Sequence, residues 1–122
     1  MDEELIGRIV LAVVMAATGV LLIWQARAAA AGKLRRNQIA GIRTAATLSS
    51  DEAWLAAHQR AKNVCVLAGV EALAVAGAVL LPLSTAGFVS VVLAGCIIML
   101  ALVLYGARIG VAAAREVTAS VG

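Results

Sequence analysis

The sequence predicts an all-α integral membrane protein with three transmembrane helices and a short cytoplasmic amphipathic helix. Of the 122 residues, 63% are hydrophobic and 14% are charged, and the mean hydropathy is +1.00. Soluble domains are about 45–50% apolar and about 25% charged. The apolar residues also form two long blocks, 5–24 and 64–105, with a polar segment between them. The length allows one membrane domain, residues 1–122.

The first block predicts a span at about residues 5–27. Eighteen uncharged residues, 9–26, separate Arg8 from Arg27, and about 20 apolar residues cross a bilayer core. Arg8 is near enough to the start to extend its side chain outward to the headgroups. Trp24 is typical of an interfacial anchor.

Both ends of this first helix have recognisable signals. Residues 2–4 are acidic, which suits a helix N-terminus. A secretory signal would begin with basic residues, so we expect no cleavage here. The alanine run 28–31 is expected to extend the helix into water as far as Gly32, where a helix can end.

The second block is too long for one span. Its 42 residues, 64–105, would make a helix about 63 Å long, whereas the hydrocarbon core is about 30 Å thick. Turn chemistry occurs only at 81–87, LPLSTAG, where a proline precedes Ser84 or Thr85 as a helix N-cap. We therefore predict spans at about 64–81 and 86–107, followed by a helical tail.

The polar segment forms the predicted cytoplasmic loop, 28–63. Ser49 followed by Glu52 has the spacing of a capping box, which would start a helix over residues 50–63. Its apolar face suits the inner membrane surface, and the helix either stops before the second span or continues directly into it.

Basic residues set the expected orientation. Nine of the ten, seven in 25–63 and two in the C-terminal tail, lie on one side of a three-span arrangement, and only Arg8 lies on the other. Cytoplasmic segments carry the excess of Lys and Arg. We therefore expect a multi-pass cell-membrane protein with the N-terminus outside and the loop and C-terminus in the cytoplasm.

The stretch from Asn37 to His58 has the pattern GIRT-x-x-T-x-S-x-x-x-x-W-x-x-x-H. This pattern resembles the signature loop of the SdpI family, small bacterial membrane proteins named for immunity against a secreted killing peptide. The chain would match the short, three-span form. The positions concerned are Asn37, Gly41, Ile42, Arg43, Thr44, Thr47, Ser49, Trp54 and His58.

The resemblance implies an immunity protein that protects the cell from a membrane-active peptide toxin and signals through its cytoplasmic loop. The expected partners are membrane lipid, a peptide toxin or a cytoplasmic regulatory protein, and a second copy of the chain. The alternative is a small proton-coupled multidrug exporter, which would use an intramembrane carboxyl group.

Residues of the signature loop have several possible roles. Arg43 suits a phosphate or carboxylate of a ligand, because its five donors form a fixed fork; otherwise it pairs with Asp51 or Glu52, or with lipid phosphate. Trp54 is either an interfacial anchor or part of a binding site. For His58 we expect a hydrogen bond to the GIRT loop. Hydroxyl groups of the two threonines would stabilise the turn.

Glu71 is the only charged residue in the second block and would lie near mid-membrane. A charged carboxylate there is costly, so we expect a protonated side chain facing the bundle interior. Thr18 and Ser90 are possible partners at similar depth. Its role is either proton-linked or ligand-binding, or purely structural, joining helices by hydrogen bonds.

Other classes of function have little support. Cys65 and Cys96 lie in apolar runs without CxxC spacing, and His58 is the only histidine, so we expect no metal and no cofactor. We expect no enzyme activity, since no nucleophile or phosphate loop accompanies the few acid–base candidates. Basic residues flank apolar runs without interleaved aromatics, so we expect no nucleic-acid binding.

Overall fold

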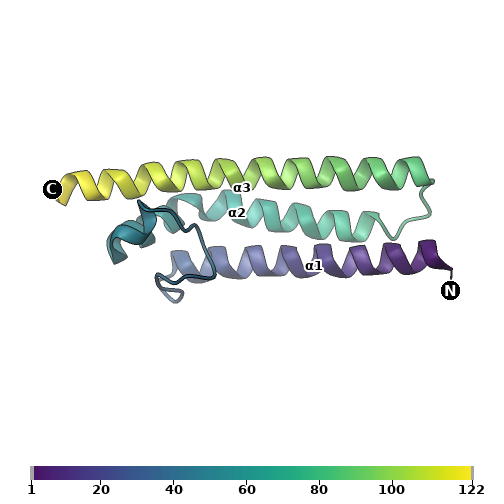
Figure 1. Cartoon of the computed structure of the whole chain (residues 1–122), viewed down its shortest axis with the longest axis horizontal. Helices are drawn as coiled ribbons and strands as arrows, with labels where there is room; N and C mark the ends of the chain where they lie inside the picture. Colours follow the sequence, from purple (N-terminus) through teal and green to yellow (C-terminus); the bar gives the residue numbers. More distant parts are fainter. Residues whose placement is uncertain (1, 122) are drawn as a thin grey trace.

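Three long helices run side by side along most of the molecule (Figure 1). In this computed structural model, which describes residues 2–121, they are α1 (Glu3–Ala30), α2 (Asp51–Ala78) and α3 (Thr85–Val121). A short 3-10 helix, η1 (Thr47–Ser49), precedes α2. All three long helices are long and apolar enough to cross a membrane. The predicted all-α architecture with three membrane-spanning helices is confirmed.

Helix α2 lies between α1 and α3 and packs against both (Figure 1). The N-terminus and the connection between α2 and α3 lie at one end of the molecule. The segment 31–50 and the C-terminus lie at the opposite end. The polar loop and the C-terminal tail are therefore neighbours, as an arrangement of three antiparallel spans requires.

The predicted surface helix and the second span are one continuous helix, α2. Its N-cap is Ser50, which has an extended backbone and whose hydroxyl oxygen accepts the N–H of Ala53 at 3.0 Å. The predicted capping box starting at Ser49 is wrong. Ser49 is part of η1, and its hydroxyl donates to the carbonyl of Ala46 at 2.7 Å, so it is not available to cap α2.

The ends of the other helices follow the local sequence signals. At the start of α1, the Asp2 carboxylate accepts the N–H of Leu5 at 2.7 Å. Before α3, the Ser84 hydroxyl accepts the N–H of Gly87 at 3.1 Å, which agrees with the predicted N-cap. Helix α3 continues well past residue 107, as expected for the tail.

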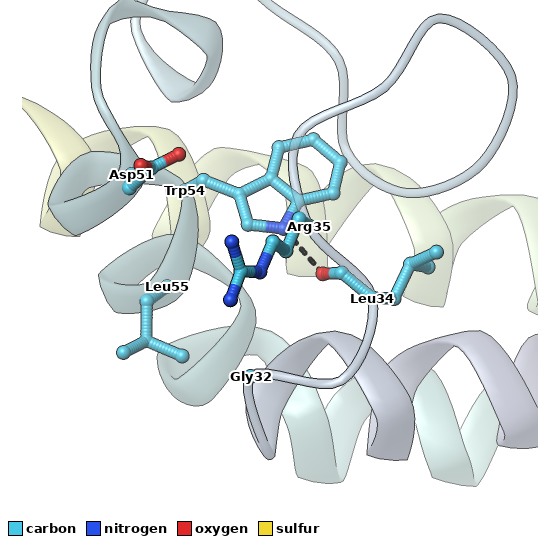
Figure 2. A pocket seen from close by; sticks show the side chains of 6 residues that line it. All are labelled: Gly32, Leu34, Arg35, Asp51, Trp54 and Leu55. Atoms are coloured by element: carbon cyan, nitrogen blue, oxygen red, sulfur yellow. Dashed lines mark hydrogen bonds between the residues drawn. The ribbon is translucent and has the colours of Figure 1, made fainter.

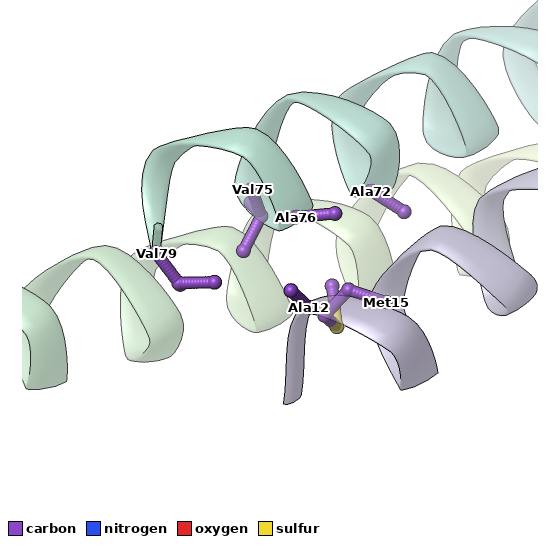
Figure 3. Packing of buried hydrophobic residues seen from close by; sticks show 6 residues of the cluster. All are labelled: Ala12, Met15, Ala72, Val75, Ala76 and Val79. Atoms are coloured by element: carbon purple, nitrogen blue, oxygen red, sulfur yellow. The ribbon is translucent and has the colours of Figure 1, made fainter. Parts of the chain in front are cut away.

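Small residues let the helices approach closely. The buried cluster between α1 and α2 contains alanine, valine and a single methionine (Figure 3): Ala12, Met15, Ala72, Val75, Ala76 and Val79. Where the two helices cross, a Cβ added to Gly19 would lie 2.6 Å from the carbonyl oxygen of Gly69. Backbone therefore meets backbone at this crossing, and a larger residue would force the helices apart.

Arg8 ties α1 to the turn between α2 and α3. Its guanidinium donates to the carbonyls of Leu81 at 3.2 Å and Leu83 at 2.8 Å, and it pairs with Glu4 at 2.7 Å. It also lies over the ring of Phe88, 4.8 Å from the centroid. The side chain extends toward this end of the molecule as predicted, but it closes the turn instead of ending in solvent.

Large apolar side chains cover the outer faces of the helices. Val13, Leu21 and Ile97 are each more than half exposed, like many other valine, leucine and isoleucine residues of α1 and α3. In water such a surface would drive association, because exposed apolar patches of this extent are rare in soluble monomers. The acyl chains of a bilayer are the environment that suits it.

Both cysteines are free thiols.

Candidate functional site

Residues 37–58, here called the signature unit, fold as one body at the end of the molecule where α1 ends and α2 begins (Figure 1). The unit combines an irregular loop, η1 and the first two turns of α2. It contacts α2 and α3 through η1. Its shape depends on a small number of side chains that hold the loop against α2.

Gly41 permits the closest contact of the loop with α2. Its φ of +105° is a conformation that L side chains rarely adopt. An added Cβ would lie 2.6 Å from the Trp54 ring and 2.9 Å from Nε2 of His58. Glycine is therefore required here for two reasons, conformation and space.

His58 fastens the loop to α2 through both ring nitrogens. The N–H of Ile42 donates to Nε2 at 2.9 Å, and Nδ1 lies 2.8 Å from the carbonyl oxygen of Trp54. Nε2 must accept, so the proton resides on Nδ1 and the ring is neutral. His58 precedes the apolar segment of α2, which starts at residue 64. Burial lowers the pKa of its imidazole, and the hydrogen bond to the Trp54 carbonyl partly opposes this shift. The predicted hydrogen bond to the GIRT loop is confirmed.

Thr47 is completely buried and organises the turn that precedes η1. Its hydroxyl donates to the carbonyl of Ile42 at 2.6 Å and accepts the N–H of Thr44 at 2.9 Å. The hydroxyl of Thr44 in turn accepts the N–H of Thr47 at 3.2 Å. The two threonines therefore stabilise the turn as predicted. They also fix Ile42, whose side chain packs near Ala26 and Ala61 and so joins the loop to α1 and α2.

Trp54 is a buried part of the unit, with 3% of its surface exposed. Its indole N–H donates to the carbonyl of Leu34 at 2.9 Å (Figure 2), and its ring lies 4.2 Å from that of His58. An anchor in the membrane interface would expose its ring to headgroups, so the interpretation as an interfacial anchor is wrong. The ring is enclosed because the loop passes over it at Gly41.

Asn37 and Arg43 shape the outer part of the loop. The Asn37 carboxamide oxygen accepts the N–H groups of Ile39 and Ala40 at 2.8 and 2.7 Å, forming a local turn. The Arg43 guanidinium donates to the carbonyl of Gln38 at 2.6 Å. The Arg43 side chain is exposed.

The expected pairing of Arg43 with Asp51 or Glu52 is not present. Arg36 instead pairs with Asp51 at 2.8 Å and donates to the carbonyl of Leu48 at 3.0 Å. The sequence offered several arginines within reach of these carboxylates. Only the path of the loop decides which arginine reaches them.

A pocket of about 280 Å³ opens between the loop and the start of α2 (Figure 2). Trp54 and Leu55 provide apolar lining, and Arg35 and Asp51 provide opposite charges. The Arg35 side chain extends from the loop across this pocket toward α2. Within residues 2–121, no group of His, Cys, Asp and Glu side chains is placed to hold a metal ion. The arrangement can bind a polar or charged group of a partner.

Residues 33–106 match the SdpI/YfhL protein family. The chain belongs to this family. The match covers more than half of the sequence and includes the whole signature unit and the apolar segment up to Gly106. Comparison with curated proteins and with solved structures finds no match. Together with three helices able to span a bilayer, membership of the SdpI/YfhL family identifies a multi-pass membrane protein.

Glu71 lies far from the signature unit of this SdpI/YfhL protein, about 20 Å along α2 from His58. Its Oε1 is close to Gly95 of α3, and its Oε2 is buried without a hydrogen-bond partner in the described part of the chain. The carboxyl group therefore faces a neighbouring helix, as predicted. The proposed partners are wrong: Thr18 and Ser90 each donate to a carbonyl of their own helix.

Several residues of the site escaped prediction. Leu34 receives the indole hydrogen bond through its backbone, which no side-chain pattern reveals. Ser50 is the true N-cap of α2, but the capping-box spacing points to Ser49, which stands three positions before Glu52. A Cβ added to Gly110 would lie 3.1 Å from the Ala57 carbonyl oxygen and 3.1 Å from the Ile42 side chain, so α3 approaches the unit closely at this glycine. The GxxxG spacing of Gly106 and Gly110 is the sequence pattern that indicates such a close approach.

Proposed function

We propose that this protein is an integral membrane immunity factor, which binds a membrane-active peptide toxin and thereby protects the cell. Membership of the SdpI/YfhL family supports a membrane immunity-type protein. Within it we assign binding to the signature unit. The toxin is the partner we consider first, and a cytoplasmic regulatory protein that reads the same surface is the second.

The observation that carries this assignment is a difference between buried, bonded side chains and exposed arginines in the unit and in the segment just before it. The polar atoms of Thr47 and His58 are bonded within the unit, and the indole N–H of Trp54 is bonded to Leu34 in the segment that leads into it, so these side chains hold the shape of the unit. The guanidinium groups of Arg35 and Arg43 are exposed, and neither has an ion-pair partner within residues 2–121. Arginine is enriched at the energetically dominant positions of protein interfaces.

An apolar side chain lies between these arginines in sequence. Ile39 is 88% exposed at the tip of the local turn that Asn37 forms. A basic surface with an apolar tip suits a partner segment that combines acidic and apolar side chains. We infer a binding activity without catalysis, because His58 and Thr47 are committed to the fold. By the distribution of basic residues, this surface lies in the cytoplasm and the N-terminus lies outside.

Protection assays with Arg43 variants test this proposal. Arg43→Ala in a host exposed to a membrane-active killing peptide should abolish protection while the protein stays in the membrane at its normal level. Arg43→Lys should restore protection poorly, because an ammonium group cannot reproduce a bidentate guanidinium. Arg60→Ala, an exposed arginine on α2 outside the signature unit, is the matched control and should protect fully. Normal protection by Arg43→Ala would refute the assignment.

The unpartnered carboxyl of Glu71 favours a second candidate, a small proton-coupled exporter. A buried carboxyl group without a fixed partner can take up and release a proton during transport. A strain lacking the protein would then become sensitive to cationic dyes and not to killing peptides. Glu71→Gln would abolish dye resistance in that case, whereas an immunity protein with a structural Glu71 should tolerate it, because Gln keeps hydrogen-bonding capacity.

A further inference from the structure

The last turns of α1 carry an open groove of about 520 Å³ that the signature unit does not use. Val20 and Ile23 provide an apolar lining, and Trp24, Arg27 and Lys33 complete it. The helical residues recur at intervals of three and four, so they share one helix face. Trp24 is 53% exposed on this face, in contrast to buried Trp54.

The chain reversal after α1 brings Lys33 back to this face. Gly32 has a φ of +78°, the left-handed conformation typical of a helix end. The N–H of Lys33 then donates to the carbonyl of Ala28 at 2.8 Å, and that of Gly32 donates to Ala29 at 3.2 Å. The reversal places a second cation beside Arg27, although six positions separate the two in sequence.

Neither cation of this groove has an acidic partner in the described chain. The ion pairs within residues 2–121 are Arg8 with Glu4 and Arg36 with Asp51. A helix C-terminus normally disfavours an anion, because its free carbonyls carry partial negative charge.

Here the last four carbonyls of α1 are all occupied, which reduces this repulsion. Those of residues 27–29 accept backbone N–H groups of the reversal, and that of Ala30 accepts the Gln59 carboxamide at 3.3 Å. The two positive charges therefore remain without compensation next to a capped helix end. The groove is electrostatically suited to an anion.

The depth of the groove in the membrane indicates where that anion comes from. Arg8 and Arg27 are nineteen positions apart on α1, about 28 Å along the helix, close to the thickness of the hydrocarbon core of about 30 Å. With Arg8 at one surface, Arg27 and Lys33 lie at the level of the opposite headgroups. Trp24 then lies where aromatic side chains are enriched.

We propose that this groove binds one phospholipid with an anionic headgroup, whose phosphate lies between Arg27 and Lys33 and whose acyl chain follows Trp24 and Val20. The apolar lining and the two cations occur in the order that a phospholipid presents from chain to headgroup. A soluble anion would use the cations and leave the apolar lining unused.

Quenching of tryptophan fluorescence by brominated lipids tests the proposal on the whole protein. The chain has two tryptophans, and buried Trp54 contributes a background that a Trp24→Phe variant measures. The protein is reconstituted in phosphatidylcholine vesicles with a fixed minority of brominated phosphatidylglycerol, or with the same fraction of brominated phosphatidylcholine. We expect the anionic lipid to be preferred at Trp24 by about five-fold per cation.

Two charge-neutralised variants distinguish an effect of the groove cations on lipid preference from an effect of the overall positive charge of the protein. Arg27→Gln with Lys33→Gln should abolish the preference. Arg60→Gln with Lys62→Gln removes the same charge from exposed positions on α2 and should retain it. Equal quenching by the two lipids in the wild type, or the same loss in both variants, would overturn the proposal. Reversal by inorganic phosphate, but not by chloride at equal ionic strength, would overturn the lipid assignment in favour of a soluble anion site.

Discussion

At the scale of single residues, the signature unit separates side chains that build the fold from side chains that remain available. Trp54, His58 and Thr47 are buried and bonded to backbone atoms of the loop. Arg43 is exposed, and within residues 2–121 its guanidinium bonds only to the carbonyl of Gln38. Substitution of Trp54 by alanine would remove a buried aromatic ring, which costs about 3–5 kcal/mol in soluble cores. We therefore expect such a variant to lose protein as well as protection.

His58 should make the attachment of the loop sensitive to pH. The unfolded chain binds a proton on this residue near the ordinary pKa of 6.5, whereas burial lowers the pKa in the folded unit. The unfolded state therefore holds more protons below pH 6.5, and the stability of the unit falls as the pH drops through that range. Protonated Nε2 could no longer accept the N–H of Ile42.

Amide hydrogen exchange at Ile42, corrected for the intrinsic rate, measures this effect. We expect lower protection at pH 5.5 than at pH 7.5. His58→Gln serves as the control, because its carboxamide does not titrate and the pH dependence should vanish. His58 is the only histidine in the chain, so no other histidine contributes. Equal protection of the wild type at both pH values would contradict the prediction.

At the scale of elements, two adjacent serines distinguish the true start of α2 from the expected one. Ser50 caps the helix through Ala53, whereas Ser49 bonds to Ala46 within the preceding turn. Ser50→Ala should destabilise the protein by about 1 kcal/mol, the usual cost of losing an N-cap. Ser49→Ala should cost clearly less, because this side chain is exposed. Thermal unfolding of both variants in the same detergent compares their losses of stability. A larger loss for Ser49→Ala than for Ser50→Ala would contradict the assignment of Ser50 as the N-cap and would support a capping box that starts at Ser49.

The helices were predictable from the sequence because hydrophobic length alone determines where a chain can cross a bilayer. The turn before α3 and the end of α1 also followed from local signals, Ser84 and Gly32. The interior of the loop was predictable only where one residue had one plausible partner, as with His58. The partner of Asp51 was not predictable, because both Arg36 and Arg43 are near enough in sequence to pair with it. Which arginine reaches Asp51 depends on the conformation of the loop, and that conformation depends on contacts between residues distant in sequence.

At the scale of the whole molecule, cysteine labelling tests which end faces the cytoplasm. In a variant without native cysteines, a probe at position 84 should react with a membrane-impermeant reagent added outside the cell. A probe at position 45, an exposed site in the loop, should react only after the membrane is permeabilised. The connection between α2 and α3, which contains position 84, and the segment 31–50, which contains position 45, lie at opposite ends of the molecule. The reverse result would therefore invert the proposed orientation.

The continuity of α2 has a mechanical consequence. Asp51 and Glu71 are twenty positions apart on an unbroken helix, about 30 Å along its axis. A helix without a proline or a break moves as a rigid rod, so a tilt of about 10° centred at Glu71 would displace Asp51 by about 5 Å. Asp51 is bonded to Arg36. A peptide that pushed the middle of α2 aside inside the bilayer would therefore pull on the loop outside it, without touching the loop itself.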